Sequence, residues 1–332
     1  MIGQETHDVE RKVTAILKLL SDSREPLGGR IISRRLKEQG IDLGERAVRY
    51  HLKIMDERGF TRIAGSRDGR SITPPGLEEL KNALVYDKMG FLSDRIELLA
   101  YQTTFDPQRH AGDVPVDISL FPRKEFKRAL NAMGNIFDAG LCVSDLVAMA
   151  SEGEKIGEII VPEGKIGFAA VCSIVVSGSL LKAGIPIDSR FSGIIQVRNY
   201  EPVRFVDLIE YTGSTLEPSE VFITGKMTSV VETARTGNGK ILGSFHEVPM
   251  VSKAAAEKVI AKLKSAGLCN SVIMGKTTEP LCEIPVRLNK SGLILFSGLN
   301  PVAAAAEAGI IVSPKAMGGV IDIGRLRSFR SL

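Results

Sequence analysis

The feature that most constrains the fold of this chain is an internal repeat. Gly140-Leu141-Cys142 recurs as Gly267-Leu268-Cys269, an offset of 127 residues, and Pro122 matches Pro249 at the same offset. Lys182-Ala183-Gly184-Ile185 resembles residues 307–310 at an offset of 125. Self-similarity of this kind indicates a duplicated structural unit. We therefore predict two copies of one unit, at about 94–205 and 220–329.

Each copy is expected to begin with a strand and a helix, followed by the Gly-Leu-Cys segment, further strands, a short helix and a closing strand. In the first copy the expected elements are strand 114–120, helix 124–139 and strand 165–176; in the second they are strand 240–247, helix 253–266 and strand 292–296. Helices over one sheet per copy predict a layered α/β (α+β) fold. Two such copies are expected to pack with pseudo-two-fold symmetry and to leave a cleft between them.

The first 80 residues have the element order of a winged helix-turn-helix. Apolar residues at helical spacing predict one face of a first helix, Val13, Ile16, Leu17 and Leu20, and the inward face of a second, Ile31, Ile32 and Leu36. Asp42 and Glu45 have the spacing of a capping box ahead of a third helix that stops at Gly59. Two short strands, 60–64 and 71–73, flank a hairpin turn at Asp68-Gly69. We expect a winged helix over 1–80, a helical linker over 81–93 and a sensing and dimerisation domain over 94–332.

The third helix has two distinct faces. Val48, Leu52 and Met55 are expected to pack inward, whereas the other face carries three cations and a phenol. Residues 28–70 hold 11 Lys and Arg against 6 Asp and Glu, although the net charge of the whole chain is only +4. We predict DNA contacts from Arg46, Arg49, Tyr50, Lys53, Arg67 and Arg70. The alternatives are a solvated charged face, and a winged helix that binds another protein.

Composition and motifs exclude several other classes. No stretch approaches the roughly 18 apolar residues of a membrane span, and the polar N-terminus has no signal-peptide core. The four cysteines lack CxxC spacing and form no evident zinc cluster with the four histidines. We therefore expect a reduced, cytoplasmic protein without a cofactor or metal. The chain has no P-loop, Rossmann fingerprint, GxSxG or HExxH motif, so an enzyme is not expected.

Three polar segments are candidates for binding a small acid. They are Cys172-Ser173 on an apolar strand, the loop 184–191 that presents Ser189 and Arg190, and the hydroxyl-rich segments 211–215 and 226–230, which include Thr228 and Ser229. Hydroxyls, backbone N–H groups and a cation are the groups that bind a carboxylate. Each segment alone is more typical of a capped turn.

These residues carry a resemblance to the NrpR family of nitrogen-response repressors from methanogenic and related archaea. The resemblance covers nearly the whole chain and rests on residues 42–59, 101–106, 239–245 and 298–301. Its most distinctive motif is Leu180-Leu181-Lys182-Ala183-Gly184-Ile185-Pro186-Ile187-Asp188-Ser189-Arg190-Phe191. Ser297 stands where the family pattern has glycine.

The resemblance implies a repressor that binds palindromic operators of nitrogen-assimilation genes as a homodimer or higher oligomer. It also implies release of the double-stranded DNA when 2-oxoglutarate binds the sensing domain. On that basis, the expected 2-oxoglutarate contacts are Cys172, Ser173, Ser189, Arg190, Thr228 and Ser229. Some members carry two sensing domains, so a second NrpR-type repressor is a possible partner of this chain. A corepressor that contacts another repressor or a basal transcription factor, and an enzyme fused to a DNA-binding domain, are the competing interpretations.

Overall fold

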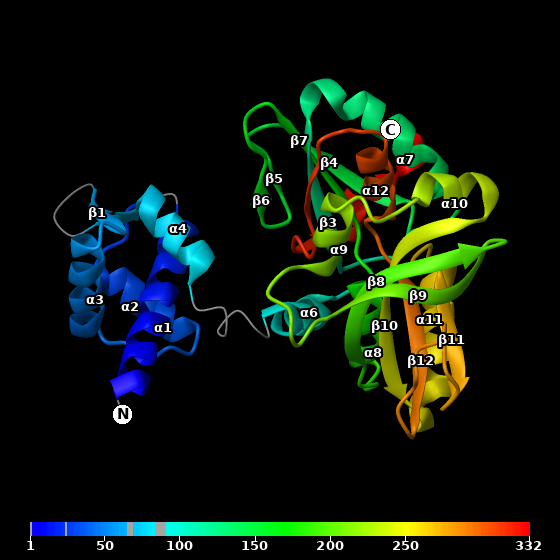
Figure 1. Ribbon diagram of the computed structural model, residues 1–332, viewed down its shortest axis with the longest axis horizontal. Helices are drawn as coiled ribbons and strands as arrows, with labels where there is room; N and C mark the ends of the chain where they lie inside the picture. The colour runs from blue at the N-terminus through cyan, green and yellow to red at the C-terminus, as the bar shows by residue number, and fades with distance from the viewer. Residues whose placement is uncertain (1, 24, 65–68, 84–90) are drawn as a thin grey trace. The chain divides into compact units, whose positions relative to one another are not determined.

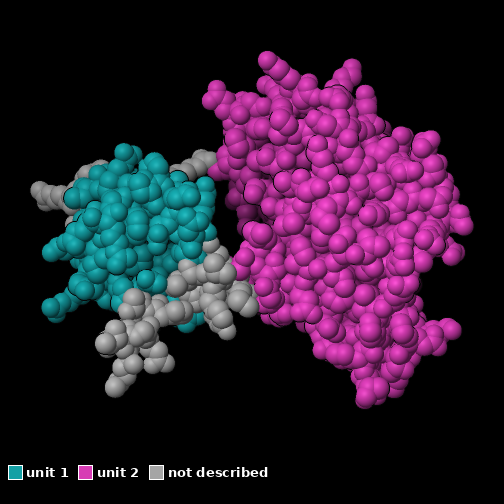
Figure 2. Space-filling view, in the orientation of Figure 1, with its two compact units in different colours: residues 1–89 teal, residues 90–332 magenta. Residues whose placement is uncertain are grey.

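The computed structural model describes residues 2–23, 25–64, 69–83 and 91–332. The chain divides into two compact units, residues 1–89 and 90–332 (Figure 2). Element labels follow Figure 1. Within the described ranges, every helix is too short or too polar to cross a bilayer.

The first unit is a winged helix. Its elements are α1 (Ile2–Ser21), α2 (Gly29–Glu38), α3 (Glu45–Glu57), β1 (Thr61–Ile63), β2 (Arg70–Ile72) and α4 (Pro74–Asn82). The strands β1 and β2 form an antiparallel hairpin in which Thr61 lies opposite Ile72. The apolar faces expected from periodicity meet in one core, which includes Ile16, Leu36 and Met55.

Two local predictions in this unit are wrong. Ile31 is 39% exposed and faces away from the core. The expected capping box does not form, because α3 begins at Glu45 with Gly44 as its N-cap residue and no side-chain cap. Leu43 is buried, and the segment 41–44 that it anchors is not helical. The helix therefore starts too late for Asp42 to cap it.

The second unit contains two large β-sheets, with helices packed against them (Figure 1). Its helices are α6 (Phe91–Gln102), α7 (Phe126–Asp138), α8 (Ile174–Lys182), α9 (Pro218–Thr224), α10 (Val230–Thr236), α11 (Lys253–Ser265) and α12 (Asn300–Glu307). Its strands are β3 (Asp113–Pro122), β4 (Leu146–Ala150), β5 (Lys155–Ile156), β6 (Ile159–Ile160), β7 (Lys165–Val171), β8 (Asp188–Arg198), β9 (Glu201–Glu210), β10 (Gly239–Pro249), β11 (Val272–Thr277), β12 (Lys290–Phe296), β13 (Ser313–Lys315), β14 (Val320–Asp322) and β15 (Arg327–Ser328). Four single turns of 3-10 helix occur at Arg123–Glu125, Met250–Ser252, Ile323–Arg325 and Phe329–Ser331.

The two copies of the repeat exchange their closing strands. The strand β8 follows α8 in the first copy but pairs with β10 of the second copy, with Gly193 opposite Gly243. Reciprocally, β13 and β14 follow α12 in the second copy and pair with β3 of the first. The resulting sheets have the orders β11-β12-β10-β8-β9 and β13-β3-β7-β4-β15. The expectation of one sheet per copy is therefore wrong, because each sheet is completed by the other copy.

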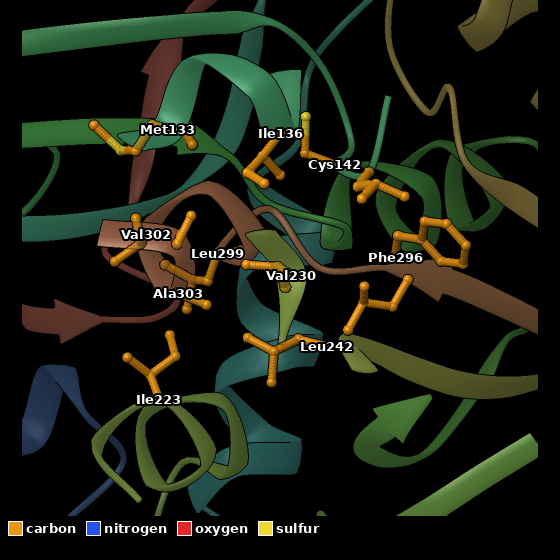
Figure 3. Packing of buried hydrophobic residues seen from close by; sticks show 14 of the residues in the cluster. Met133, Ile136, Cys142, Ile223, Val230, Leu242, Phe296, Leu299, Val302 and Ala303 are labelled. Atoms are coloured by element: carbon orange, nitrogen blue, oxygen red, sulfur yellow. The ribbon is translucent and has the colours of Figure 1, made fainter. Parts of the chain in front are cut away.

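The helices are exchanged in the same way. The helix α7 of the first copy packs on α12 of the second, and α8 of the first copy contacts α11 of the second. Figure 3 shows Met133 and Ile136 of α7 beside Val302 and Ala303 of α12. Both large cores of this unit thus contain residues from both copies.

One expected strand ends earlier than predicted. Strand 165–176 stops as β7 at Val171, and the helix α8 begins at Ile174. All residues from Ile174 to Leu180 are buried, so only the end of this helix, at Leu181 and Lys182, faces solvent. A short, uniformly apolar run cannot be assigned to helix or strand from periodicity alone. Cys172 and Ser173 therefore lie in a strand-to-helix turn.

Candidate functional site

The exposed face of α3 carries four of the residues predicted to contact DNA. Arg46, Arg49, Tyr50 and Lys53 are all exposed, and Tyr50 keeps 63% of its surface in solvent. The Arg49 guanidinium lies 2.9 Å from the Glu45 carboxylate, one helical turn away. That pair is solvent-exposed and therefore weak, so it does not prevent Arg49 from binding a phosphate or a base edge.

The hairpin residues are placed differently. Arg70 donates from Nε to the Asp56 carboxylate at 2.9 Å, and its side chain is mostly buried. Thr61 donates to the other oxygen of Asp56 at 2.6 Å. This network ties the hairpin to α3 and gives Arg70 a structural role within the unit. Arg67 and the Asp68 position of the predicted turn lie outside the described residues.

A small polar cavity lies where the two sheets of the second unit meet. Its volume is about 40 Å³. Equivalent positions of the two copies face it together, since Asp117 on β3 matches Ser244 on β10, and Cys172 after β7 matches Ser297 after β12. Ser173, Ser192, Tyr211, Glu217 and His246 complete most of its polar lining. We call this cavity the central pocket.

The central pocket contains two acids, Asp117, which is buried, and Glu217, which is partly buried. Burial raises the pKa of the Asp117 carboxyl to about 6, although hydrogen bonds from Met317 and Cys172 oppose the shift. Burial likewise raises the pKa of Glu217 to about 8, opposed by the backbone N–H of Glu220. A carboxyl with a pKa near 8 is mostly protonated at neutral pH. Glu217 can therefore donate a hydrogen bond to a ligand oxygen.

His246 connects this pocket to the predicted loop. Its Nε2 lies 2.8 Å from the Ser244 hydroxyl, and its Nδ1 lies 2.9 Å from the Ser189 hydroxyl. Burial lowers the pKa of His246 to about 4, so the ring is neutral at pH 7. Cys172, Ser173 and, through His246, Ser189 are thus brought to one place.

Arg190 is held by an internal carboxylate. Its guanidinium lies 3.3 Å from the fully buried Glu247 carboxylate. Arg287 also donates to Glu247, at 2.9 Å from its backbone N–H and at 2.5 Å from its Nε. Since Arg190 points at Glu247, an incoming anion has to compete with a carboxylate that is already in place.

Thr228 binds a carboxylate of the chain itself, whereas Ser229 binds a backbone N–H group. Glu307, at the end of α12, accepts from the Thr228 hydroxyl and the Val230 N–H, both at 2.7 Å, and from the Val231 N–H at 3.1 Å. The Ser229 hydroxyl accepts from the Lys240 N–H at 2.8 Å. The segment has the carboxylate-binding chemistry predicted for it, but Thr228 and Ser229 do not line the central pocket.

Asp117, Tyr211, Glu217, Ser244 and His246 were not among the predicted ligand contacts. A signal for two of them existed in the repeat, because the offset of 127 residues relates Asp117 to Ser244. Positions related in this way meet near the axis between the copies. Tyr211 lies in a segment noted for its hydroxyls, whereas Glu217 has no distinguishing pattern around it.

Comparison with known protein families gives a match for each of the two units. Residues 89–328 match the family model described as NrpR regulatory domains NRD1 and 2, and residues 14–80 match the Ribonuclease R winged-helix domain. The global nitrogen regulator NrpRI of Methanosarcina mazei is 38% identical over 314 residues, which cover 95% of this chain and 96% of the relative. The match therefore extends over essentially the full length of both proteins.

Two longer relatives and one solved structure are also similar. The global nitrogen regulators NrpR of Methanococcus maripaludis and Methanocaldococcus jannaschii are 29% and 30% identical over 94% and 97% of this chain, which spans 54% and 56% of their lengths. A crystal structure of a nitrogen repressor-like protein from Methanococcus jannaschii superposes with a TM-score of 0.61 at 25% identity, covering 72% of this chain and 98% of that one.

A DNA-binding winged helix joined to a duplicated regulatory domain defines a transcription regulator. Within that class, the chain belongs to the NrpR family of global nitrogen regulators. The family is one of transcription regulators rather than enzymes.

Proposed function

We propose that this protein is a sequence-specific repressor of nitrogen-assimilation genes that binds palindromic operators as a dimer and leaves DNA when 2-oxoglutarate binds. The full-length similarity to a global nitrogen regulator supports this proposal most directly. The exposed basic face of α3 supplies the groups that meet a major groove. In a dimer, two such helices would contact successive grooves about 34 Å apart.

The central pocket is the proposed effector site. Ser173, Ser192 and Ser244 offer hydroxyls, and the protonated Glu217 carboxyl offers a further donor. Ser189 reaches the pocket through His246. Arg190 would contribute to the second carboxylate of the ligand only by exchanging its contact with Glu247. In this proposal Thr228 acts through its contact with Glu307, and Ser229 acts through its contact with the Lys240 N–H.

A gel shift tests this function. The purified protein is bound to a palindromic fragment that it has itself selected from random DNA, and 2-oxoglutarate is then titrated, with glutamate in a parallel series. Release by 2-oxoglutarate alone is the expected result. Binding that persists with every acid would overturn the inducer function, and failure to select any sequence would overturn specific DNA recognition.

The length of the longer relatives favours a second candidate. This chain spans about half of each of two NrpR proteins. A partner that carries a second sensing domain, or a basal transcription factor, would make this protein a corepressor. Tight binding to such a partner, with only weak and sequence-independent DNA binding, would distinguish that function.

A further inference from the structure

The helix α6 forms a wall of the central pocket. Ile96 lines the pocket, and it belongs to a small core with Cys172, Tyr211 and Met317. The same helix lines a second cavity of about 500 Å³, whose opposite side is α8 and residues 186–189. In the sequence, α6 is the first described element after residues 84–90, which follow the winged helix. The helix α6 is therefore the described element of the second unit that is nearest in sequence to the winged helix.

Arg95 links α6 to Met317, which lines the central pocket. Its guanidinium donates twice to the Met317 carbonyl oxygen, at 3.1 and 2.7 Å, and lies 2.8 Å from Glu158. On the other side of the same residue, the Met317 N–H donates to the Asp117 carboxylate at 2.9 Å. One residue thus links an acid of the pocket to α6.

Met317 adopts a left-handed backbone conformation, with φ at 54°. This region is unfavourable for a residue with a long side chain, so it persists only where surrounding contacts impose it. The bonds from Asp117 and Arg95 are two of those contacts. Backbone bonds between Gly318 and Val116 and between Gly319 and Val116 hold the rest of the turn against β3, so the Arg95 bonds are the ones that extend this turn to α6.

The other end of α6 is fixed more tightly. Gly178 of α8 lies so close to Ala100 and Thr103 that an added Cβ would come within 2.4 to 2.7 Å of their atoms. The Thr103 side chain is fully buried. The C-terminal half of α6 is therefore pinned against α8, whereas the Arg95 bonds and the packing of Ile96 hold the N-terminal half. This arrangement would allow the N-terminal half of α6 to move while its C-terminal end stays in place.

The central pocket is too small for a five-carbon dicarboxylate, since 40 Å³ has room for only about one or two water molecules. Ligand entry must therefore displace part of its wall, which includes Ile96 of α6 and Met317, the residue whose carbonyl accepts from Arg95. We infer that Arg95 is a positioning residue that couples occupancy of the central pocket to α6, and through α6 to release of DNA. This inference rests on the proposed function. A ligand can shift the equilibrium only by preferring one arrangement of such an element.

The test uses the full chain and the variant Arg95→Gln, with Arg128→Gln as a matched control. Arg128 also donates to a backbone carbonyl, that of Ala308, and pairs with a glutamate, Glu125, but it joins α7 to the end of α12. For each protein, calorimetry measures 2-oxoglutarate affinity and gel shift measures the concentration that releases DNA. In Arg95→Gln we expect affinity within about threefold of the unsubstituted protein and a release concentration raised by about tenfold or more.

Arg95→Lys retains one charged donor and is expected to restore part of the coupling. Release of Arg95→Gln at the concentration that releases the unsubstituted protein would overturn the inference. If the unsubstituted protein ignores 2-oxoglutarate, the proposed function fails, and amide hydrogen exchange on the ligand-free chain decides the role of Arg95. Faster exchange over residues 91–102 in Arg95→Gln than in Arg128→Gln supports it, and equal exchange overturns it.

Discussion

At the scale of single residues, carboxyls that are buried or partly buried give the sensing unit its chemical character. Glu247 and Glu307 bind Arg190 and Thr228, which were predicted to bind a carboxylate of the ligand. Asp117 and Glu217, by contrast, line the central pocket. The first pair is satisfied by cations or N–H groups. In the second pair, desolvation raises the pKa of both carboxyls and so favours the neutral acid.

Glu217→Gln should change how stability depends on pH. The folded pKa of about 8 lies above the ordinary glutamate pKa of 4.5, so the stability that this carboxyl contributes is complete below about pH 4.5 and is lost as pH rises toward 8. Glutamine does not titrate. We expect the free energy of unfolding of the variant, relative to the unsubstituted protein, to rise by on the order of 3 kcal/mol between pH 5 and pH 8.

Urea unfolding at both pH values measures this difference. The exposed Glu201→Gln serves as the control and should show no change in the difference between pH 5 and pH 8. A Glu217→Gln difference that is the same at both values would contradict a raised pKa.

At the scale of elements, α3 presents its cations to solvent. Replacing Arg49 with Ala should weaken operator binding by about 1–3 kcal/mol if the guanidinium contacts a base edge. Anisotropy of a labelled palindromic fragment measures the loss, and Arg109→Ala in the second unit, also exposed, is the control. An affinity equal to that of the control would remove Arg49 from the interface.

The contact between α6 and α8 allows a second comparison. Gly178→Ala places a methyl group against Ala100 and Thr103 and should destabilise the protein by about 1–3 kcal/mol. Gly134 lies within α7 and has only Phe329 near the added Cβ, at 3.8 Å. Gly134→Ala should therefore be neutral or stabilising by up to about 1 kcal/mol. Chemical unfolding measures both, and equal effects would show that α6 can move away from α8 without cost.

Elements formed by interactions between residues close in sequence could be predicted, whereas contacts between residues far apart in sequence could not. The winged helix follows from local periodicity, because its helices have one apolar face each, and the repeat reveals the duplication. The short helix before the Ala-Gly-Ile segment was predicted, but the start of α8 was assigned to the preceding strand because residues 174–180 are all buried and give no amphipathic pattern. The roles of Arg190 and Thr228 were not visible, because Glu247 and Glu307 lie 57 and 79 residues further along the chain.

At the scale of the whole molecule, the exchange of strands makes the two copies interdependent. The pattern of β8 does not specify whether it pairs within its own half or with β10, because residues 191–195 are buried continuously and would be buried in either sheet. The choice becomes visible only in the register of the assembled sheets.

Cutting the chain between residues 213 and 214 tests this interdependence. Each half alone would lack strands that complete its sheet, so we expect residues 91–213 and 214–332 to be largely unfolded separately and to form a structured heterodimer when mixed. Circular dichroism and sedimentation measure the two states. Independent folding of either half would show that the closing strand can return to its own sheet.

The covalent connection between the copies also changes the molecularity of their pairing. Two separate copies that complete each other would associate bimolecularly, and dilution would unfold them. On one chain the same pairing is unimolecular, with an effective concentration set by the connecting segment. The integrity of the sensing unit is thus independent of how many molecules a cell contains. Concentration can then govern only the contacts that this protein makes with other molecules.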